Sequence, residues 1–212
     1  MSKHLLLAFI LLLSLDAFAQ TLCVQENKAW VLGEFKRPPN VNPVISPKTD
    51  TEFFCPMRQE RVKWEESDTF NPAAVVKDGK IVVLYRAEDN SAQGIGSRTS
   101  RIGYAESADG IIMTRRMEPV LFPAEDANKV LEWPGGCEDP RVAMTEDGLY
   151  VMLYTAWNRN KARLAVAISR DLINWKKHGL AFGRAYDGRF KNLSCKSASL
   201  VTRIKDDKLV IE

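Results

Sequence analysis

The sequence predicts an all-β protein built from a repeated unit of antiparallel strands. Its 212 residues include many short runs rich in Val, Ile, Tyr and Trp, separated by Gly, Pro, Asn and Asp, which is the pattern of strands and turns. The stretch that begins at Arg101 is similar to the stretch that begins at Arg163, and all matched positions are the same number of residues apart. No run spaces apolar residues three and four positions apart over a dozen residues, so a helical fold is not favoured.

The first unit reads as four strands in chain order. Asn71-Pro72 leads the first strand, and an Asp78-Gly79 turn connects it to the apolar strand 81–85. An alternating strand from Arg101 and a short strand after a Ser-x-Asp turn at Asp109 complete the unit. The second unit has the same features in the same order. Asp139-Pro140 leads its first strand, an Asp147-Gly148 turn precedes the apolar strand 149–154, an alternating strand starts at Arg163, and the Ser-x-Asp turn is at Asp171.

A third unit begins at Lys196, and an Asp206-Asp207 turn precedes its next strand. Four-stranded antiparallel units that recur about every 60 to 70 residues are typical of β-propeller blades, because radial repetition protects the strand edges. Two units and part of a third do not close a ring, so we expect the chain to be the N-terminal part of a longer protein. The predicted division is a signal peptide at 1–19, an N-terminal extension at 20–66 and a partial propeller at 67–212.

The N-terminal residues have the features of an export signal. Lys3 and His4 precede an apolar run over 5–15, and Ala17-Phe18-Ala19 forms the small-x-small pattern of a cleavage site. The run is well short of the ~20 residues that span a bilayer, so we expect a periplasmic or extracellular protein without a stable membrane span. Lipid anchoring at Cys23 is the less favoured alternative, because the residue before it is a bulky Leu.

Composition and spacing exclude several classes of function. A net charge of +3 is too mild to predict a nucleic-acid partner. The four cysteines form no C-x-x-C pair, and no metal or cofactor is expected. The Gly94-x-Gly96 pattern does not precede a helix, which argues against nucleotide binding. A Ser-His-Asp hydrolase is not favoured, because His4 lies in the signal, His178 lies in a turn and no Gly-x-Ser-x-Gly elbow is present.

The repeat also indicates where functional residues lie. In a propeller, the first strand of each blade lines the central channel, so Asn71 and Asp139 should project from equivalent positions toward a shared axial pocket. Glu138-Asp139 follows a Gly-Gly pair and precedes Arg141, and a carboxylate with such neighbours can have its pKa shifted and serve as a general acid or base. The alternative is a structural loop in which Arg141 is an ion-pair partner.

Two further charged segments have both a functional and a structural interpretation. The run 86–89 places Arg, Glu and Asp at the end of an inner strand, where they could hold sugar hydroxyls or form a solvated turn. The segment 159–196 contains ten Lys or Arg against two Asp, which suits either an anion such as phosphate or a solubilising outer face.

An ordered set of motifs resembles glycoside hydrolase family 130, the β-mannoside phosphorylases and β-1,2-mannosidases, over about residues 64–212. The set consists of Phe70-Asn71-Pro72-Ala73, Leu84-Tyr85-Arg86-Ala87-Glu88-Asp89, Ser100-Arg101-Ile102-Gly103, Gly135-Gly136-Cys137-Glu138-Asp139-Pro140-Arg141, Tyr154-Thr155-Ala156 and Ser169-x-Asp171-Leu172-x-x-Trp175. The Glu-Asp-Pro-Arg element is the most specific part of the set.

The resemblance implies a five-bladed propeller, of which this chain would cover the first two to three blades, with the sugar in the axial pocket. It implies that Asp139 is the catalytic acid of an inverting mechanism, with the proton passing through a hydroxyl of the bound mannose. The residues implied to line the mannose subsite are Asn71, Arg86, Asp89 and Arg141. Arg163 and Lys196 are the candidates for binding phosphate or another anion.

The expected partner is therefore a mannose-containing oligosaccharide, and three functions fit it. A hydrolase is favoured because phosphorolysis conserves bond energy as a sugar phosphate, which is of little use to an exported enzyme. A phosphorylase that uses inorganic phosphate and releases mannose 1-phosphate is the alternative, and a non-catalytic carbohydrate-binding propeller is the third. We expect the second catalytic group to lie beyond Glu212, and the sequence predicts no oligomeric state.

Overall fold

The computed structural model describes residues 34–212, so the signal peptide and the Cys23 alternative lie outside the described residues. Residues 40–212 form one compact unit, which contains every strand of the described residues. These are twelve strands and one short helix, α2 (Lys129–Glu132), which confirms the all-β prediction. Within the described residues, no helix has the length and apolar character needed to cross a bilayer.

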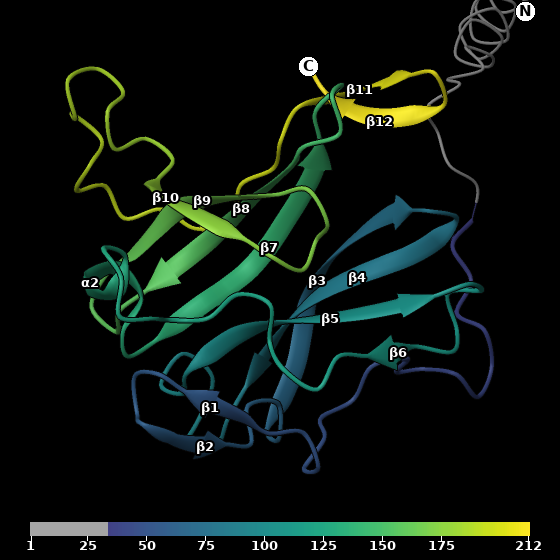
Figure 1. Ribbon diagram of the computed structural model, residues 1–212, viewed down its shortest axis with the longest axis horizontal. Coiled ribbons are helices and arrows are strands. Elements are labelled where there is room, and N and C mark those ends of the chain that lie inside the picture. The colour runs from purple at the N-terminus through teal and green to yellow at the C-terminus, as the bar shows by residue number, and fades with distance from the viewer. Residues whose placement is uncertain (1–33) are drawn as a thin grey trace, which may run out of the picture. The chain divides into compact units, whose positions relative to one another are not determined.

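Eight of the strands form two antiparallel meanders that follow each other in the chain (Figure 1). Meander 1 comprises β3 (Asp68–Lys77), β4 (Lys80–Glu88), β5 (Ser100–Ser107) and β6 (Thr114–Arg115). Meander 2 comprises β7 (Gly136–Met144), β8 (Tyr150–Trp157), β9 (Ala162–Ser169) and β10 (Lys176–Leu180). The number of residues between the starts of β5 and β9 equals the number between Arg101 and Arg163, and the same holds for the starts of β6 and β10. The sequence repeat therefore corresponds to a structural repeat.

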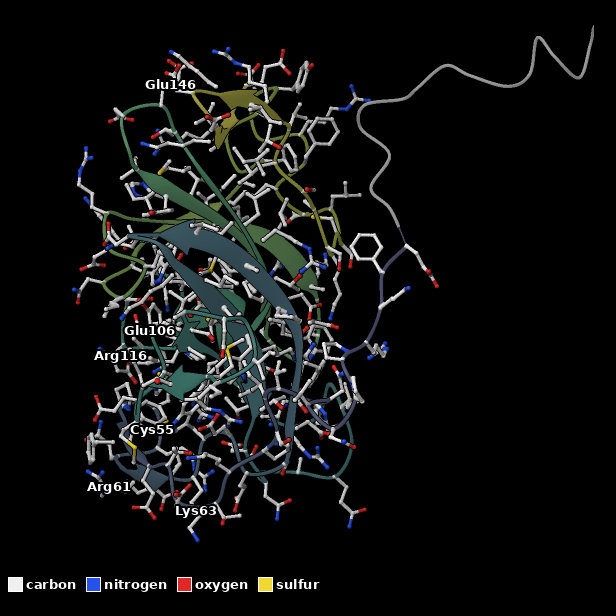
Figure 2. The ribbon with its side chains drawn as sticks, turned by 90° about the vertical axis from the view of Figure 1, so that its right-hand side faces the viewer. Cys55, Arg61, Lys63, Glu106, Arg116 and Glu146 are labelled. Carbon is white, nitrogen blue, oxygen red and sulfur yellow. The ribbon has the colours of Figure 1, made fainter. Side chains whose placement is uncertain are left out.

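Two hairpins flank the meanders. The third unit, which we expected to begin at Lys196, has its first strand later, as β11 (Thr202–Lys205), and the expected Asp206-Asp207 turn joins it to β12 (Lys208–Ile211). Glu146 in the β7–β8 turn, labelled in Figure 2, pairs with Arg203 and Lys205 of this hairpin. At the N-terminal side, β1 (Phe53–Cys55) and β2 (Glu60–Val62) form a hairpin whose buried residues pack with Trp64 against β4. The residues from 40 to 66 therefore belong to the same compact unit as the meanders.

The two meanders share one apolar core and meet directly at their first strands. Val82, Leu84 and Ile102 of meander 1 belong to the same buried cluster as Met152 and Tyr154 of meander 2. Burial of such side chains contributes about 1.5 to 3 kcal/mol each, so the cluster accounts for much of the association between the meanders. A parallel bridge between Ser100 and Gly136 joins β5 to β7 at the edge of this core.

A β-bulge interrupts the first strand of each meander at the equivalent point. The β3–β4 register shifts between Phe70 and Ala73, and the β7–β8 register shifts between Glu138 and Arg141. Asn71 and Asp139, which we expected at the beginning of their strands, lie inside the strands at these bulges with φ values of 46° and 51°. A bulge bends the strand and redirects its side chains, which explains how both residues come to face the junction between the meanders.

Candidate active site

The structure brings Asp139 and three of the predicted site residues into direct contact at the junction between the meanders. The Asp139 side chain is buried, and its Oδ1 accepts hydrogen bonds from Asn71 Nδ2 at 2.8 Å and from Arg86 Nη1 at 3.1 Å. Its Oδ2 lies 3.2 Å from the Nζ of Lys196. The four residues come from β7, β3, β4 and the segment that follows β10, so the site exists only when these separate elements have come together.

Arg86 is the centre of this cluster. Its guanidinium is buried and donates from Nε to Ser100 Oγ at 3.0 Å and from Nη2 to Glu88 Oε1 at 2.6 Å. The same Nη2 lies 2.8 Å from Glu138 Oε1, and the ring of Phe70 faces the guanidinium at 4.5 Å. Three carboxylates therefore share one guanidinium, whose planar fork suits several acceptors at once.

Lys196 supplies the second positive charge of the site. Its Nζ binds Glu138 Oε2 in addition to its ion pair with Asp139. The Lys196 side chain is 46% exposed, whereas those of Glu138 and Asp139 are almost fully buried. Lys196 therefore reaches the buried carboxylates from the solvent side.

The two adjacent carboxyl groups of β7 differ in their acidity. Burial alone would raise the pKa of Asp139, but the hydrogen bond from Asn71 and the charges of Arg86 and Lys196 outweigh burial and lower this pKa below its usual value. Burial raises the pKa of Glu138, and Arg86 and Lys196 offset this only in part. Neighbouring carboxyl groups with oppositely shifted pKa values are a common arrangement in acid–base catalysis.

Asp89 lies in a separate network, although the resemblance implies that it lines the sugar subsite. Its Oδ2 accepts a hydrogen bond from Arg101 at 2.8 Å, and its Oδ1 accepts from the backbone N–H groups of Ser91 and Thr99. These contacts turn the Asp89 side chain into the loop that joins β4 to β5. Asp89 therefore orders this loop and makes no contact with Asp139.

The two remaining candidates also lie away from the carboxylates. Arg141 donates from Nη1 to the carbonyl of Pro140 at 2.8 Å and lines a cavity of about 250 Å³ together with Ser199. Arg163 lies on β9 beside Phe182, Phe190 and other side chains of the segment that follows β10. Of the two predicted anion-binding residues, the structure thus brings only Lys196 to Asp139.

Two contributors to the site were not assigned from the sequence. Glu138 was noted only as a neighbour of Asp139, although it contacts both cations of the site. Ser100 hydrogen-bonds Arg86 and Glu88 through its hydroxyl and pairs with Gly136 across the meander junction. Ser100 belongs to one of the motifs that carry the family resemblance, but its role does not follow from the motif, because the contact depends on a parallel bridge between strands of different repeats.

Comparisons with known proteins agree with this architecture. A family model described as beta-1,4-mannooligosaccharide phosphorylase matches residues 36–212. The chain is 34% identical over 142 residues to the 1,2-beta-oligomannan phosphorylase of Thermoanaerobacter sp. (strain X514), which covers 65% of the chain and 42% of the relative. It is 32% identical over 146 residues to the beta-1,2-mannobiose phosphorylase of the same organism, with 64% and 43% covered.

Solved structures give higher identities. The chain is 62% identical to a putative glycoside hydrolase from Parabacteroides distasonis, with a TM-score of 0.84 and coverage of 88% of this chain and 53% of that one. A putative glycosidase from Bacteroides thetaiotaomicron is 64% identical, with a TM-score of 0.84 and 89% and 54% covered. A third structure is 59% identical, with a TM-score of 0.85 and coverage of 89% of this chain and 52% of that one. Its description states that the GH130 family of mannoside phosphorylases contains glycoside hydrolases that target beta-1,2 mannosidic linkages in Candida mannan.

The chain spans about half the length of the relatives and structures that it matches. The family model nevertheless covers nearly all of the described residues, including both meanders and every residue of the Asp139 cluster. The protein belongs to glycoside hydrolase family 130.

Proposed function

We propose that the protein is an exported enzyme that cleaves β-mannosides, with β-1,2-linked mannose as the substrate and Asp139 as the general acid. The contact set of Asp139 is the observation that supports this assignment most. A buried carboxylate is held by one amide and two cations at a junction where strands of two repeats meet. Relatives described as acting on β-1,2-linked oligomannan and mannobiose support the substrate class.

In the proposed reaction, Asp139 gives a proton to the oxygen of the scissile glycosidic bond through a hydroxyl of the bound mannose. The bond between the anomeric carbon and this oxygen breaks, and a nucleophile attacks the anomeric carbon from the opposite face. Arg86 and Asn71 fix the orientation of the Asp139 carboxyl. The lowered pKa keeps Asp139 ionised near neutral pH, so it must take up a proton from solvent before it can act as the acid. Sugar binding that weakens its contact with Lys196 would raise this pKa and favour the protonated form.

We propose hydrolysis as the reaction, because phosphorolysis requires a pocket that attracts an anion. Both cations that contact Asp139 are already shared with buried carboxylates: Arg86 with Glu88 and Glu138, and Lys196 with Glu138. Among the described residues, this cluster leaves little positive charge for a phosphate ion. The 59% identity to a structure reported together with β-1,2-mannoside hydrolases points the same way.

Hydrolysis with inversion also needs a carboxylate that activates water on the opposite face of the sugar, about 6.5 to 9.5 Å from the acid. Glu88 and Glu138 bind the same guanidinium as Asp139, so they lie on the acid's side of the site. The water-activating group is therefore proposed to come from another part of the protein.

Phosphorolysis is the second candidate, and the names of the curated relatives favour it. Both relatives are phosphorylases, at 34% and 32% identity. In this case Lys196, which is half exposed, would leave Glu138 and bind the phosphate that attacks the anomeric carbon.

We also propose that each meander is one blade of a five-bladed propeller and that the β11–β12 hairpin belongs to a third blade. The common offset between β5 and β9, and between β6 and β10, supports this arrangement. Asp139 and Asn71 would then face the axial pocket from the innermost strands of adjacent blades.

Product analysis of the full-length protein on β-1,2-mannobiose, with and without inorganic phosphate, tests the reaction. Free mannose at the same rate in both conditions supports hydrolysis. Mannose 1-phosphate that forms only with phosphate would replace this proposal with phosphorolysis. If neither product forms while the disaccharide still binds, the protein is a carbohydrate-binding module instead.

A further inference from the structure

Each meander contains a buried triad made of a glutamate, a tyrosine and a cation, outside the Asp139 cluster. In meander 2, Tyr154 Oη donates to Glu132 Oε1 at 2.7 Å, and Lys177 Nζ donates to Glu132 Oε2. Lys177 Nζ also donates to the carbonyl of Phe122 at 2.7 Å. Glu132 and Tyr154 are fully buried, so this triad ties α2 and the connection before β7 to the interior of the meander.

Meander 1 repeats this arrangement. Tyr85 Oη donates to Glu65 Oε2 at 2.7 Å, and Arg115 Nη1 donates to the same oxygen at 3.1 Å. Glu65 is fully buried, like its counterpart Glu132. The tyrosines take the same place on β4 and β8, and Arg115 and Lys177 are separated by the offset of the repeat, so the triads are equivalent members of the structural repeat.

The glutamate of each triad lies just before the bulged strand that contributes to the site. Glu65 precedes Asn71 by six residues, and Glu132 precedes Asp139 by seven. A buried carboxylate is costly unless its oxygens are paired. Both oxygens of Glu132 accept a hydrogen bond, whereas Glu65 accepts hydrogen bonds only at Oε2, and its buried Oε1 has no hydrogen-bond partner. Glu132 therefore fixes the beginning of β7 through two oxygens, and Glu65 fixes the beginning of β3 through one.

A continuous set of contacts connects the Glu132 triad to the catalytic cluster. The chain runs from Glu132 through three residues to Gly136, and the carbonyl of Gly135 accepts a hydrogen bond from the N–H of Ser100 at 2.8 Å. A Cβ atom on Gly136 would lie 2.1 Å from the carbonyl oxygen of Ser100, so the two strands approach as closely as glycine allows. The Ser100 hydroxyl in turn bonds Arg86, which holds Asp139.

We infer that Glu132 is a positioning residue for catalysis: it holds the beginning of β7 so that Asp139 meets Arg86 across the meander junction. Glu132 acts through the segment 133–136 and does not touch the Asp139 cluster itself. The kinetic part of this inference rests on the proposed function. Glu65 provides a natural control, because it is as fully buried as Glu132 but its strand contributes only neutral side chains, Asn71 and Phe70, to the site.

The test compares Glu132→Gln and Glu65→Gln in the full-length protein, by steady-state kinetics on β-1,2-mannobiose, by thermal unfolding and by crystal structures. Both variants should lower the Tm by a few degrees, because each weakens a buried triad. Glu132→Gln should lower kcat by about 10-fold or more with KM within about threefold of wild type, because small displacements of reacting groups are costly. Glu65→Gln should keep kcat within about threefold.

Several outcomes separate positioning from stability and from the proposed function. Equal losses of kcat in the two variants, or a wild-type kcat in Glu132→Gln, would overturn the inference. If the wild-type enzyme cleaves no β-mannoside, the proposed function fails, but the crystal structures still decide the positioning: the Asp139–Arg86 contact should be lost in Glu132→Gln and kept in Glu65→Gln. If Glu132→Gln does not fold, Tyr154→Phe and its control Tyr85→Phe, which each remove one hydroxyl, provide the same comparison.

Discussion

Meander 1 and meander 2 have the same framework but differ at the residue that occupies the bulge. Both have a bulge in the first strand, a buried glutamate–tyrosine–cation triad before or beside it, and a Ser-x-Asp turn after the third strand. At the bulge, meander 1 has Asn71 and meander 2 has Asp139, and the first donates a hydrogen bond to the second. The repeated elements serve the fold, whereas the proposed catalytic group lies at a position where the two repeats carry different residues.

The difference at the bulge extends to the surroundings of each residue. Asn71 is neutral and needs no counter-ion. Asp139 is accompanied by Arg86 from the other meander and by Lys196 from the segment after β10. The carboxylate is thus stabilised by groups outside its own repeat, so the cluster forms only where the meanders meet.

The largest effect on activity is expected from Asp139→Asn, which places an amide side chain at both bulges and so removes the difference between Asn71 and Asp139. A general acid contributes about 10²- to 10⁴-fold, so the rate on β-1,2-mannobiose should fall by that factor while substrate binding persists. Steady-state kinetics and calorimetric titration with the disaccharide measure both quantities. Asn71→Ala is the control, because it removes the partner at the other bulge and should cost less activity. A fully active Asp139→Asn enzyme would show that the acid is another residue.

The second-largest effect is expected on stability, at the residues that pair with Tyr85 and Tyr154 on the neighbouring strands. Tyr85 pairs with Gly103 across β4 and β5, whereas Tyr154 pairs with Ala165 across β8 and β9. A Cβ on Gly103 would lie 2.4 Å from Tyr85 Cζ and 2.7 Å from the ring of Trp64, so Gly103→Ala should destabilise the protein by about 1 to 3 kcal/mol.

Urea unfolding of the full-length protein measures this effect, and Ala165→Gly is the matched exchange in meander 2. Ala165→Gly inserts no atom, so we expect a smaller loss of stability, which comes from backbone entropy and a small void. Equal losses in the two variants would mean that Trp64 moves aside and that meander 1 is no more tightly packed than meander 2 at this point.

The repeat could be predicted from the sequence because it depends on local patterns. The Asp-Gly turns, the Ser-x-Asp turns and the stretches matched at a constant offset are all short, and they correctly indicated two equivalent meanders and the beginning of a third unit. The encounter of Asn71 with Asp139 follows from the same reasoning, because equivalent positions of adjacent repeats face one another.

The details that the sequence did not predict depend on contacts between distant segments or on backbone conformation. The contacts of Asp89 with Arg101 and with the N–H groups of its own loop are an example. The left-handed φ values at Asn71 and Asp139 could not be anticipated, since each precedes a proline, and this position usually favours extended backbone. The triads have no local sequence pattern, because their members lie 20 to 50 residues apart in the sequence.

Replacing Lys196 tests whether the pKa of Asp139, at the bulge of β7, depends on the ion pair with Lys196. Its positive charge contributes to the lowered pKa of Asp139, so Lys196→Met should raise this pKa toward its usual value. Because an acid catalyst must be protonated, the alkaline limb of kcat/KM should move to higher pH, by up to about one pH unit. Lys191→Met, an exposed lysine of the same segment, should leave the pH profile unchanged. An unshifted profile combined with a raised KM for phosphate would assign Lys196 to phosphate instead.

The smallest effects are expected at the two Ser-x-Asp turns, where the meanders are most alike. Hydrogen bonds from Ile112, Ile111 and Ser107 lower the pKa of Asp109 to about 2, and in meander 2 hydrogen bonds from Asn174 and Ile173 outweigh burial and lower the pKa of Asp171. Each ionised carboxylate therefore stabilises the fold above its unfolded pKa of about 3.9, and this stability is lost as the pH falls through the folded pKa.

Asp109→Asn and Asp171→Asn should each lower the Tm of the full-length protein slightly at pH 7, and the gap to wild type should narrow as the pH is reduced from 4 to 3. The loss should be larger for Asp171→Asn, because Asp171 also accepts a hydrogen bond from the Asn174 side chain at 2.7 Å and its turn places the fully buried Leu172 in the core. Thermal unfolding between pH 7 and pH 3 measures both differences. A gap in Tm that widens toward pH 3 would contradict the lowered pKa values, and equal losses of Tm would mean that the two turns contribute equally to stability.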